Sequence, residues 1–563
     1  MRCTFVGYGR LCLWLPLVVI CLLTGGCQQE QKEQDLLQIR STNEHFTGKK
    51  KVIFVLVDSL MAQSIQRGME QNELPTFQYL IEHGQYYPDM VSSFPTMSVT
   101  IDSTLLTGSY PEGHHLPGLT WYPNNGKKVI GYGSGPFEIL RRGTKPVLTH
   151  ALKDLNGKHL NPDLPTLYED LHRLGITSGV VNGLVYRGKT EHRLNLPTPI
   201  SEFFSLAQPM VVKGPDFLAF GALSNPLDGK TDLPDGPTDR LGFTDRYAVE
   251  VAKYLIRTDQ LPDFLLIYLP DLDGKLHKHG PSDREGIRET DRRLRELLEA
   301  YDSQEKALNE TILIIAGDSG MSKVLPKDQQ PVIHLPKLLQ RYQVLPTGET
   351  VDKSTEIALA VNDTMAYVYS LKPEVALEEV ADILKSDPRI DIISWQEDGW
   401  IHCVKAGDGA SMKFKEGGNL KDQYSQSWTV QGAEQVLDLT RGSEAKQDGP
   451  TRIAYGKYPD PMRRLQGALR SHAGRFLVVT AKPGYELAEA GSPTHVGGGA
   501  HGGLDASASQ VPLIICGTKK RPDFLRIVDL KPFLLDLLQA ENRQHPIQMP
   551  GKSAIIGGIS RPK

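Results

Sequence analysis

The chain has 563 residues, of which 39% are hydrophobic and 23% are charged. This composition is typical of a globular protein that is long enough to bury a large core. Lys and Arg number 63 against 67 Asp and Glu, the formal net charge is −4, and no run of basic residues stands out. Binding to a nucleic-acid polymer needs a basic footprint, so no nucleic-acid partner is expected.

The first 26 residues have the pattern of a secretory signal peptide. Arg2 and Arg10 supply positive charge, residues 11–23 form an apolar segment too short for a spanning helix, and small residues precede Cys27. The pattern resembles the lipobox of bacterial lipoproteins, although Thr24 stands where that signal favours Leu, Val or Ile. The resemblance implies a lipid anchor on Cys27 that holds the protein at the extracytoplasmic face of the cell membrane. Secretion with cleavage nearby is the alternative.

The segment that follows the signal is predicted to be a flexible tether. Residues 27–48 begin QQEQKEQDLLQ after Cys27 and are polar and rich in Gln and Glu. Beyond this segment the chain keeps only Cys403 and Cys516. Because Cys516 ends an apolar, strand-like run, we interpret it as a buried thiol and expect no essential disulfide.

Apolar runs of strand length alternate with amphipathic segments of helix length. Residues 51–57, 262–270 and 311–317 are apolar on consecutive positions, whereas residues 165–175 and 286–301 have helical periodicity. This alternation predicts an α/β fold with a doubly wound, mostly parallel sheet whose strands are buried on both faces. Residues 49–340 are predicted to form the first part of this core.

The pattern changes between residues 341 and 450. The segments AYVYSL, VALEEVADILKSD, IDIISWQ and WIHCVKA predict a strand, a helix and two strands, which together form a small α+β cap inserted into the core. A polar, Gly-rich stretch follows at 406–426. The runs RFLVVTA and VPLIICG return to the buried-strand pattern. Residues 451–563 are therefore predicted to form the second part of the core and a C-terminal tail.

Acids and hydroxyls follow the predicted strands. Functional groups of a doubly wound sheet lie beyond the carboxyl ends of its strands. Asp58 directly follows the first strand, and Asp318 follows TILIIAG between two glycines. Each could alone be a helix N-cap or a turn residue. Residues 92–115 place several Ser and Thr hydroxyls after Pro95, at the start of a helix that would favour a phosphate, with an N-cap as the alternative.

Histidines occur in two further loops. In YLPDLDGKLHKHGP, Asp273 and His277 are four residues apart, and this carboxylate and imidazole suit a divalent ion. Asp271 and His279 are alternative ligands or solvated loop residues. The second loop, SPTHVGGGAHGGLD, has glycines that bring the backbone close to a bound group, and its two imidazoles are candidate ligands: His495 and His501.

These motifs occur in an order that points to one family. VDSL, PTMS with STLLTGSYPEGH, YLPDLDGKLHKHGP, GDSGM and GAHGG follow one another along most of residues 50–517. The order resembles the type I phosphodiesterase and nucleotide pyrophosphatase branch of the alkaline phosphatase superfamily. The resemblance implies an alkaline phosphatase-like core, a phosphate-ester substrate and two divalent metal ions of the kind that support in-line displacement at phosphorus.

The same resemblance implies the ligands of both ions. Asp58 and Asp318 would hold one ion, and Asp273, His277 and His501 would hold the other. Zinc is the expected metal, because imidazoles are typical zinc ligands. The Asp58 and Asp318 site is all oxygen, so manganese or magnesium is the alternative there.

The resemblance also implies the nucleophile. In the family's P-T-x-[ST] pattern the reacting hydroxyl falls on Ser98, which would form a phosphoseryl intermediate. Counting back from Thr107 and Gly108 favours Ser98 over its neighbours Thr96 and Thr100. Serine is a weak nucleophile at its ordinary pKa, so Ser98 is also implied to be a ligand of the second ion.

Two positions depart from the family's pattern. Ser319 stands where the family usually has a histidine, and it becomes an oxygen ligand of the second ion. Leu119 lies nearest to the position of an asparagine that binds the phosphoryl oxygen in nucleotide pyrophosphatases. The resemblance therefore indicates the reaction class more clearly than it indicates the substrate.

Three functions remain open at this point. The leading hypothesis is a membrane-anchored hydrolase of phosphate esters, a phosphodiesterase or phosphatase. A phosphotransferase that passes its group to a lipid or wall polymer would use the same ions and serine. A catalytically weakened binding protein of the same fold is favoured by the histidine missing at position 319. The cap and the loop at 120–135 are expected to line the substrate pocket.

Overall fold

The computed structural model describes residues 50–124, 126–134, 136–195, 209–442 and 451–543. The predicted signal peptide, the lipidation site at Cys27 and the tether lie outside the described residues. Within the described residues, no helix combines the length and the apolar character needed to cross a membrane.

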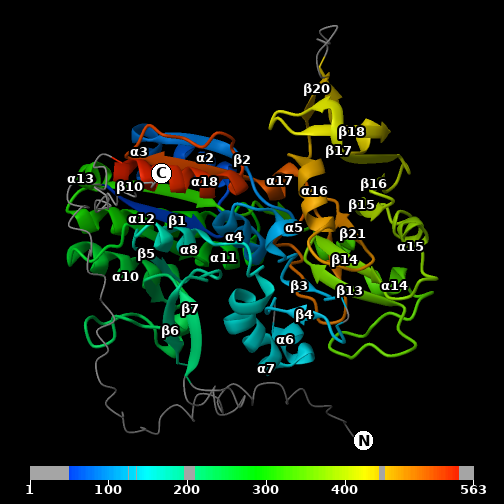
Figure 1. Ribbon diagram of the computed structural model, residues 1–563, viewed down its shortest axis with the longest axis horizontal. Coiled ribbons are helices and arrows are strands. Elements are labelled where there is room, and N and C mark those ends of the chain that lie inside the picture. Colours follow the sequence, from blue (N-terminus) through cyan, green and yellow to red (C-terminus); the bar gives the residue numbers. More distant parts are fainter. Residues whose placement is uncertain (1–49, 125, 135, 196–208, 443–450, 544–563) are drawn as a thin grey trace, which may run out of the picture.

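A seven-stranded sheet forms the centre of the larger lobe (Figure 1). The strand at its centre is parallel to both of its neighbours, and six of the seven strands run in the same direction. The order of the strands is β2 (Gln85–Val91), β24 (Gln510–Cys516), β10 (Thr311–Gly317), β1 (Lys51–Val57), β9 (Phe264–Leu269), β5 (Ser178–Val181) and β8 (Phe217–Ala219). The exception is β24, which is antiparallel to both β10 and β2.

Helices cover both faces of this sheet. Alternate residues of β1 enter two separate hydrophobic clusters, with Phe54 in one and Val55 in the other, as burial on both faces requires. One face carries α2 (Ala62–Glu70), α3 (Pro75–His83), α10 (Asp245–Arg257) and α12 (Arg284–Leu298). The other carries α4 (Ser98–Thr107), α8 (Leu167–Arg173) and α18 (Leu530–Arg543). The predicted doubly wound, mostly parallel α/β sheet is confirmed.

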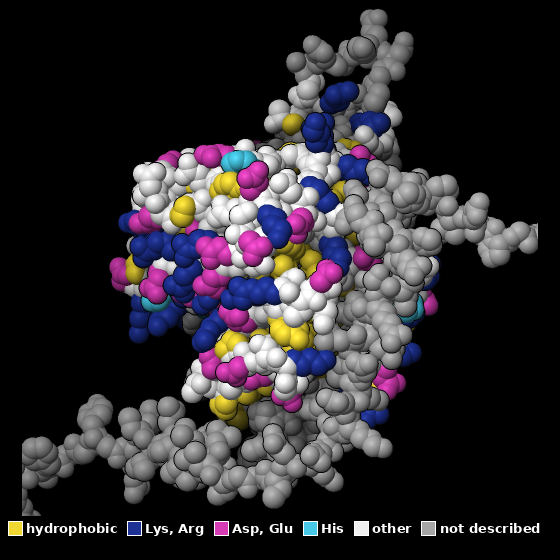
Figure 2. All heavy atoms as spheres, turned by 90° about the vertical axis from the view of Figure 1, so that its left-hand side faces the viewer, with side chains coloured by type: hydrophobic (Ala, Val, Ile, Leu, Met, Phe, Trp, Pro, Cys, Tyr) yellow, Lys and Arg dark blue, Asp and Glu magenta, His cyan; other side chains and the backbone are white. Residues whose placement is uncertain are grey.

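The outer faces of the helices are solvated. The apolar stripe predicted on the 286–301 helix is buried on α12, at Ile287, Leu294 and Leu297 among others. Figure 2 shows basic and acidic side chains interspersed over the end of the molecule where α13 (Gln304–Glu310) lies. Ion pairs such as Arg292 with Glu289, at 2.6 Å, are part of this surface. The stripe therefore belongs to the core and the charges to the surface.

A second, nine-stranded sheet forms the smaller lobe (Figure 1). The predicted strand, helix and two strands are present as β14 (Met365–Ser370), α15 (Leu377–Leu384), β15 (Ile390–Glu397) and β16 (Trp400–Lys405). The order of the strands is β13 (Ile357–Asn362), β14 (Met365–Ser370), β21 (Phe476–Ala481), β15 (Ile390–Glu397), β16 (Trp400–Lys405), β17 (Ser411–Lys421), β20 (Thr451–Tyr455) and β19 (Leu439–Arg441), with β18 (Ser427–Gly432) paired to β17.

Two segments of this sheet differ from the sequence interpretation. The polar, Gly-rich stretch contains β17, an 11-residue strand whose pairing with β18 is irregular between Glu416 and Leu420, where two glycines have positive φ. The run RFLVVTA, which its apolar pattern groups with the returning core, is β21 and lies between β14 and β15. A strand buried on both faces has the same apolar pattern in either sheet, so its sequence does not distinguish them. The proposed domain division at residue 450 stays a prediction.

Candidate active site

The carboxyl ends of three adjacent strands bring three aspartates together. Asp58 follows β1, Asp318 follows β10, and Asp273 lies in α11 (Asp271–His279), directly after β9. These strands are parallel neighbours, so their ends meet at one edge of the sheet. Ser59 joins the three positions, because its N–H donates to Asp318 Oδ1 at 2.8 Å and its hydroxyl donates to Asp273 Oδ1 at 2.8 Å.

The glycine-rich loop packs closely against α11. A Cβ on Gly498 would lie 1.9 Å from the carbonyl oxygen of His277, so only glycine fits at this contact. The approach places His501 beside His277, with ring centroids 5.2 Å apart. Two imidazoles from distant parts of the chain thus reach the same aspartate.

Asp273, His277 and His501 form a triad suited to a metal ion, with ligand atoms all within 4.8 Å of one another. Asp273 Oδ1 lies 3.3 Å from Nε2 of His277 and 3.7 Å from Nε2 of His501. Nδ1 of His277 lies 2.8 Å from the Gly499 carbonyl, and Nδ1 of His501 lies 2.5 Å from the Thr96 carbonyl. A carbonyl can only accept, so each Nδ1 carries the proton and each Nε2 is left to bind a metal.

The charges of the triad favour a cation in place of a proton. Burial opposes ionisation of Asp273, but His277, His501 and the Ser59 hydrogen bond outweigh it and lower the pKa of Asp273 to about 2. Burial likewise opposes the charged form of His277, yet Asp273 raises the pKa of His277 to about 9. A metal ion at this triad would therefore displace a proton from His277, so its affinity should rise with pH.

The second pair of predicted ligands leaves two buried carboxylate oxygens without partners. Asp58 accepts from the Tyr268 hydroxyl through Oδ2, and Asp318 accepts from the N–H groups of Ser59 and Ser319 through Oδ1. Oδ1 of Asp58 and Oδ2 of Asp318 have no hydrogen-bond partner among the described residues. Burial, followed by the charges of Asp318 and Asp273, raises the pKa of Asp58, and burial raises that of Asp318. Such oxygens are costly unless a cation binds them, so this pair fits a metal ion.

Ser98 is the first residue of α4 and is the most accessible of the candidate hydroxyls. It is partly exposed between the buried Met97 and Val99, and its hydroxyl has no hydrogen bond with any described residue. Thr96 is fully buried, and its hydroxyl accepts from the Gly502 N–H at 2.7 Å. The Thr100 hydroxyl is also buried and donates to a backbone carbonyl. Of these three hydroxyls, only the one at position 98 is thus both accessible and unengaged.

Ser319 is fully buried at the position of the family's histidine. Its hydroxyl oxygen lies 3.3 Å from that of Ser59, which in turn donates to Asp273. The short side chain therefore joins the hydrogen-bonded group between the two candidate metal sites. The alternatives named from sequence are elsewhere: Asp271 bonds Arg240 and the Asp245 N–H, and His279 is exposed.

Two residues of the site were missed by the sequence analysis. Ser59 has φ of 60°, a left-handed conformation that no local pattern indicates and that turns its N–H towards Asp318. Asp102 lies one turn after Ser98 on α4, is only 3% exposed, and has an Oδ1 atom without a hydrogen-bond partner among the described residues. Burial, followed by the charge of Asp318, raises the pKa of Asp102. An acid four residues after the predicted nucleophile was the available signal.

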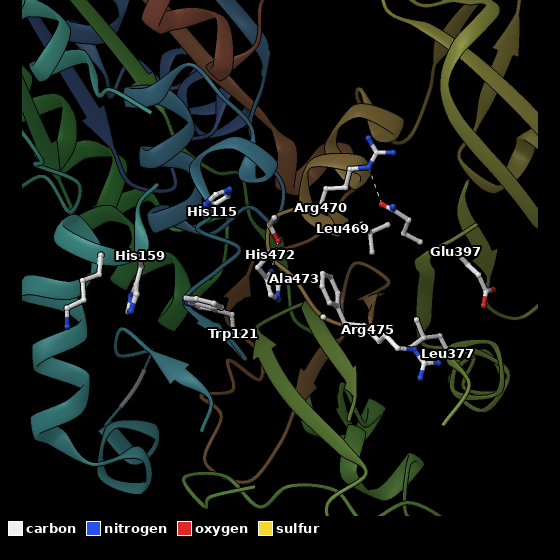
Figure 3. A pocket seen from close by; sticks show the side chains of 15 residues that line it. His115, Trp121, His159, Leu377, Glu397, Leu469, Arg470, His472, Ala473 and Arg475 are labelled. Atoms are coloured by element: carbon white, nitrogen blue, oxygen red, sulfur yellow. Dashed lines mark hydrogen bonds between the residues drawn. The ribbon is translucent and has the colours of Figure 1, made fainter. Parts of the chain in front are cut away.

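A separate cavity of about 810 Å³ lies between the two lobes. Figure 3 shows Trp121, His159 and His472 on its walls, and Glu397 of the second sheet at its edge. His472 stacks on Phe476 with centroids 4.5 Å apart, and burial lowers the pKa of His472 to about 3, so this imidazole is neutral. Trp121 of the 120–135 loop and Leu377, Gln396 and Glu397 of the predicted cap contribute to the lining, whereas none of the predicted metal ligands does. That the loop and the cap line the substrate pocket stays a prediction.

Comparison with known proteins identifies the family. A family model described as type I phosphodiesterase/nucleotide pyrophosphatase matches residues 52–504. No curated protein matches the chain. Among solved structures, murine ectonucleotide pyrophosphatase/phosphodiesterase 5 is 16% identical with a TM-score of 0.50, and the match covers 87% of this chain and 95% of that one.

The human protein of the same name is 16% identical with a TM-score of 0.51, over 90% of this chain and 97% of that one. An inactive variant of the murine protein in complex with AMP matches with the same identity and TM-score as the murine structure. At this identity the structures establish a shared fold, while the family model extends over well over half of the chain. The chain therefore belongs to the type I phosphodiesterase/nucleotide pyrophosphatase family of the alkaline phosphatase superfamily.

Proposed function

We propose that the protein is an extracytoplasmic, membrane-anchored hydrolase of phosphate esters that uses two metal ions and a phosphoseryl intermediate on Ser98. Its family carries phosphate-ester hydrolysis of the phosphodiesterase and pyrophosphatase type. The observation that most supports two ions is the pair of donor sets at one sheet edge. One is a triad with ligand atoms within 4.8 Å, and the other contains two buried carboxylate oxygens without partners among the described residues. The anchor at Cys27 rests on the sequence alone.

The residues divide between two ions. Asp273, His277 and His501 would hold the first, for which zinc is the expected metal. Asp58 and Asp318, together with the hydroxyls at positions 98 and 319, would hold the second, where manganese or magnesium is the alternative to zinc. When bound, two such ions supply positive charge that stabilises the phosphoryl oxygens and lowers the pKa of the attacking hydroxyl.

Ser98 has the position that an attacking hydroxyl needs. Attack of its Oγ on phosphorus forms the serine ester while the bond to the leaving alcohol breaks, and water then releases the phosphoryl group and restores the serine. Because Ser98 is the first residue of the ten-residue helix α4, the positive end of the helix dipole would favour a phosphoryl group bound at Ser98. The buried Thr96 carbonyl meanwhile fixes the ring of His501.

A screen of p-nitrophenyl phosphate monoesters against diesters, with added zinc, manganese or magnesium, tests this function. We expect hydrolysis of a diester that is lost on chelation and restored by one of the three metals. The screen should include a nucleotide p-nitrophenyl ester, because the structure of the inactive murine variant is a complex with AMP. Absence of turnover with every ester and metal would contradict the proposal and favour a binding protein.

Replacing the serine at the family's histidine position tests the second ion. Ser319→His is expected to raise zinc affinity at the Asp58 and Asp318 site by about tenfold or more, since it adds a nitrogen ligand. Metal competition followed by elemental analysis measures this, with Ser319→Ala as the control for loss of the hydroxyl. An unchanged metal preference would show that position 319 does not reach the ion.

A further inference from the structure

A second group of ligand atoms lies beside the triad. His277, Asp363 and His495 present atoms that all lie within 4.8 Å of one another. The group shares His277 with the triad, but Asp363 comes from the turn between β13 and β14, and His495 comes from the glycine-rich loop. The rings of His277 and His495 have centroids 4.0 Å apart and planes inclined by 31°. One further imidazole and a carboxylate, from His495 and Asp363, thus converge on His277 from outside the proposed catalytic pair of sites.

The ring of His495 is oriented as metal-binding histidines usually are. Glu486, the first residue of β22 (Glu486–Ala488), is completely buried, and its carboxylate lies 3.0 Å from Nδ1 of His495 and accepts from the His495 N–H at 2.8 Å. This contact places the proton on Nδ1 and leaves Nε2 with a lone pair. A carboxylate behind an imidazole both fixes the ring and raises its basicity as a ligand.

Asp363 supplies a carboxylate with no other partner among the described residues. Asp363 is 8% exposed and has φ of 53° in the two-residue turn between Asn362 and Met365. Its backbone carbonyl accepts from Leu487, but no described residue donates a hydrogen bond to its carboxylate. With no donor among the described residues, the Asp363 carboxylate is available to bind a cation beside the two imidazoles. The turn therefore holds an acid where a metal ion would stabilise it.

We propose that His277, Asp363 and His495 form a third site, for a divalent transition-metal ion such as zinc, distinct from the two catalytic sites. Two nitrogens and one carboxylate oxygen are a donor set that zinc favours. Because Nδ1 of His277 donates to the Gly499 carbonyl, Nε2 is the atom left for either group. The third site and the inner triad therefore compete for one imidazole.

This competition has a regulatory consequence, which rests on the proposed function. An ion in the third site takes His277 from the triad ion, which is then held by Asp273 and His501 alone, so excess zinc inhibits the enzyme. Asp363→Asn and His495→Ala should each move the zinc concentration for half-inhibition upwards by about tenfold or more. His279→Ala changes an exposed histidine of the same helix and is the matched control.

The binding itself is tested without activity. In the full chain, Asp273→Ala with His501→Ala removes the inner triad but keeps His277. Cobalt(II) added alone as the probe should give a nitrogen-ligated visible spectrum in this background. Adding His495→Ala or Asp363→Asn should weaken that binding by about tenfold or more, whereas adding His279→Ala should not.

A second measurement covers the case in which the background variant does not fold. In the otherwise unchanged chain, zinc beyond two equivalents should raise the melting temperature further, and Asp363→Asn or His495→Ala should remove this second phase. Cobalt binding that is insensitive to both substitutions, or the absence of a second thermal phase in the unchanged chain, would overturn the proposal. A chain without esterase activity that still loses cobalt on His495→Ala would contradict the proposed function and keep the third site.

Discussion

Ser98→Ala should lower the rate of phosphate-ester hydrolysis by about 10³-fold or more, because it removes the accessible and unengaged hydroxyl at the start of α4. Its hydroxyl has no hydrogen bond with any described residue, so the substitution breaks no such contact of the fold. Melting temperature and the content of the Asp273 triad ion should remain unchanged. Steady-state kinetics and elemental analysis of one preparation measure both quantities.

The neighbouring hydroxyls provide the controls for this assignment. Ser98→Thr keeps a hydroxyl and should retain part of the activity, whereas Thr96→Val removes a hydroxyl that accepts from the Gly502 N–H and should mainly lower stability. Acid quenching with a radiolabelled phosphate ester should trap label on the unchanged chain but not on Ser98→Ala. Label that persists in Ser98→Ala and disappears in Thr96→Val would move the nucleophile to Thr96.

The central sheet was predictable because its strands are buried on both faces. Burial of this kind makes β1, β9 and β10 continuously apolar, and the first polar residue after such a run must lie at the strand's end. Parallel pairing then brings Asp58 and Asp318 together. After β9 the first acid is Asp271, which bonds Arg240 instead, and Asp273 was singled out by its four-residue spacing from His277. The division of the candidate ligands between two ions came from the ordered motifs and the family that they resemble, and it stays a prediction.

The features that sequence did not reveal depend on tertiary contacts. Asp363 reaches His277 only because the β13–β14 turn of one sheet meets the helix that follows β9 of the other, and no local pattern encodes that meeting. Ser59 needs a left-handed backbone to bridge two aspartates. The apolar sequence of β21 would also fit the central sheet, so its pairing between β14 and β15 could not be read from the sequence. Propensity and periodicity describe neighbours along the chain, whereas these contacts join distant segments.

Asp58→Asn should have opposite effects on stability and on catalysis. Burial, and next the charge of Asp318, raises the pKa of Asp58 in the folded protein, so the folded state keeps a proton that the unfolded state has released. Stability of the metal-free protein must therefore fall as pH rises from the ordinary carboxyl pKa through the raised one. The amide that replaces the carboxyl group cannot ionise and its oxygen still accepts from Tyr268, so the metal-free variant should be about 1–3 kcal/mol more stable at neutral pH.

The same substitution removes a proposed ligand of the second ion, so hydrolysis should fall by about 10²-fold or more. Urea unfolding of the chelated protein across pH, together with kcat/KM in the presence of metal, measures the two effects on one variant. Asp328→Asn makes the same chemical change at an exposed position and should alter neither. A metal-free Asp58→Asn protein that is less stable than the unchanged chain at neutral pH would show that the ionised carboxylate of Asp58 makes a stabilising interaction in the folded state. A stabilised but inactive variant is expected instead, because the buried carboxylates proposed to bind the metal ion lower the stability of the metal-free protein.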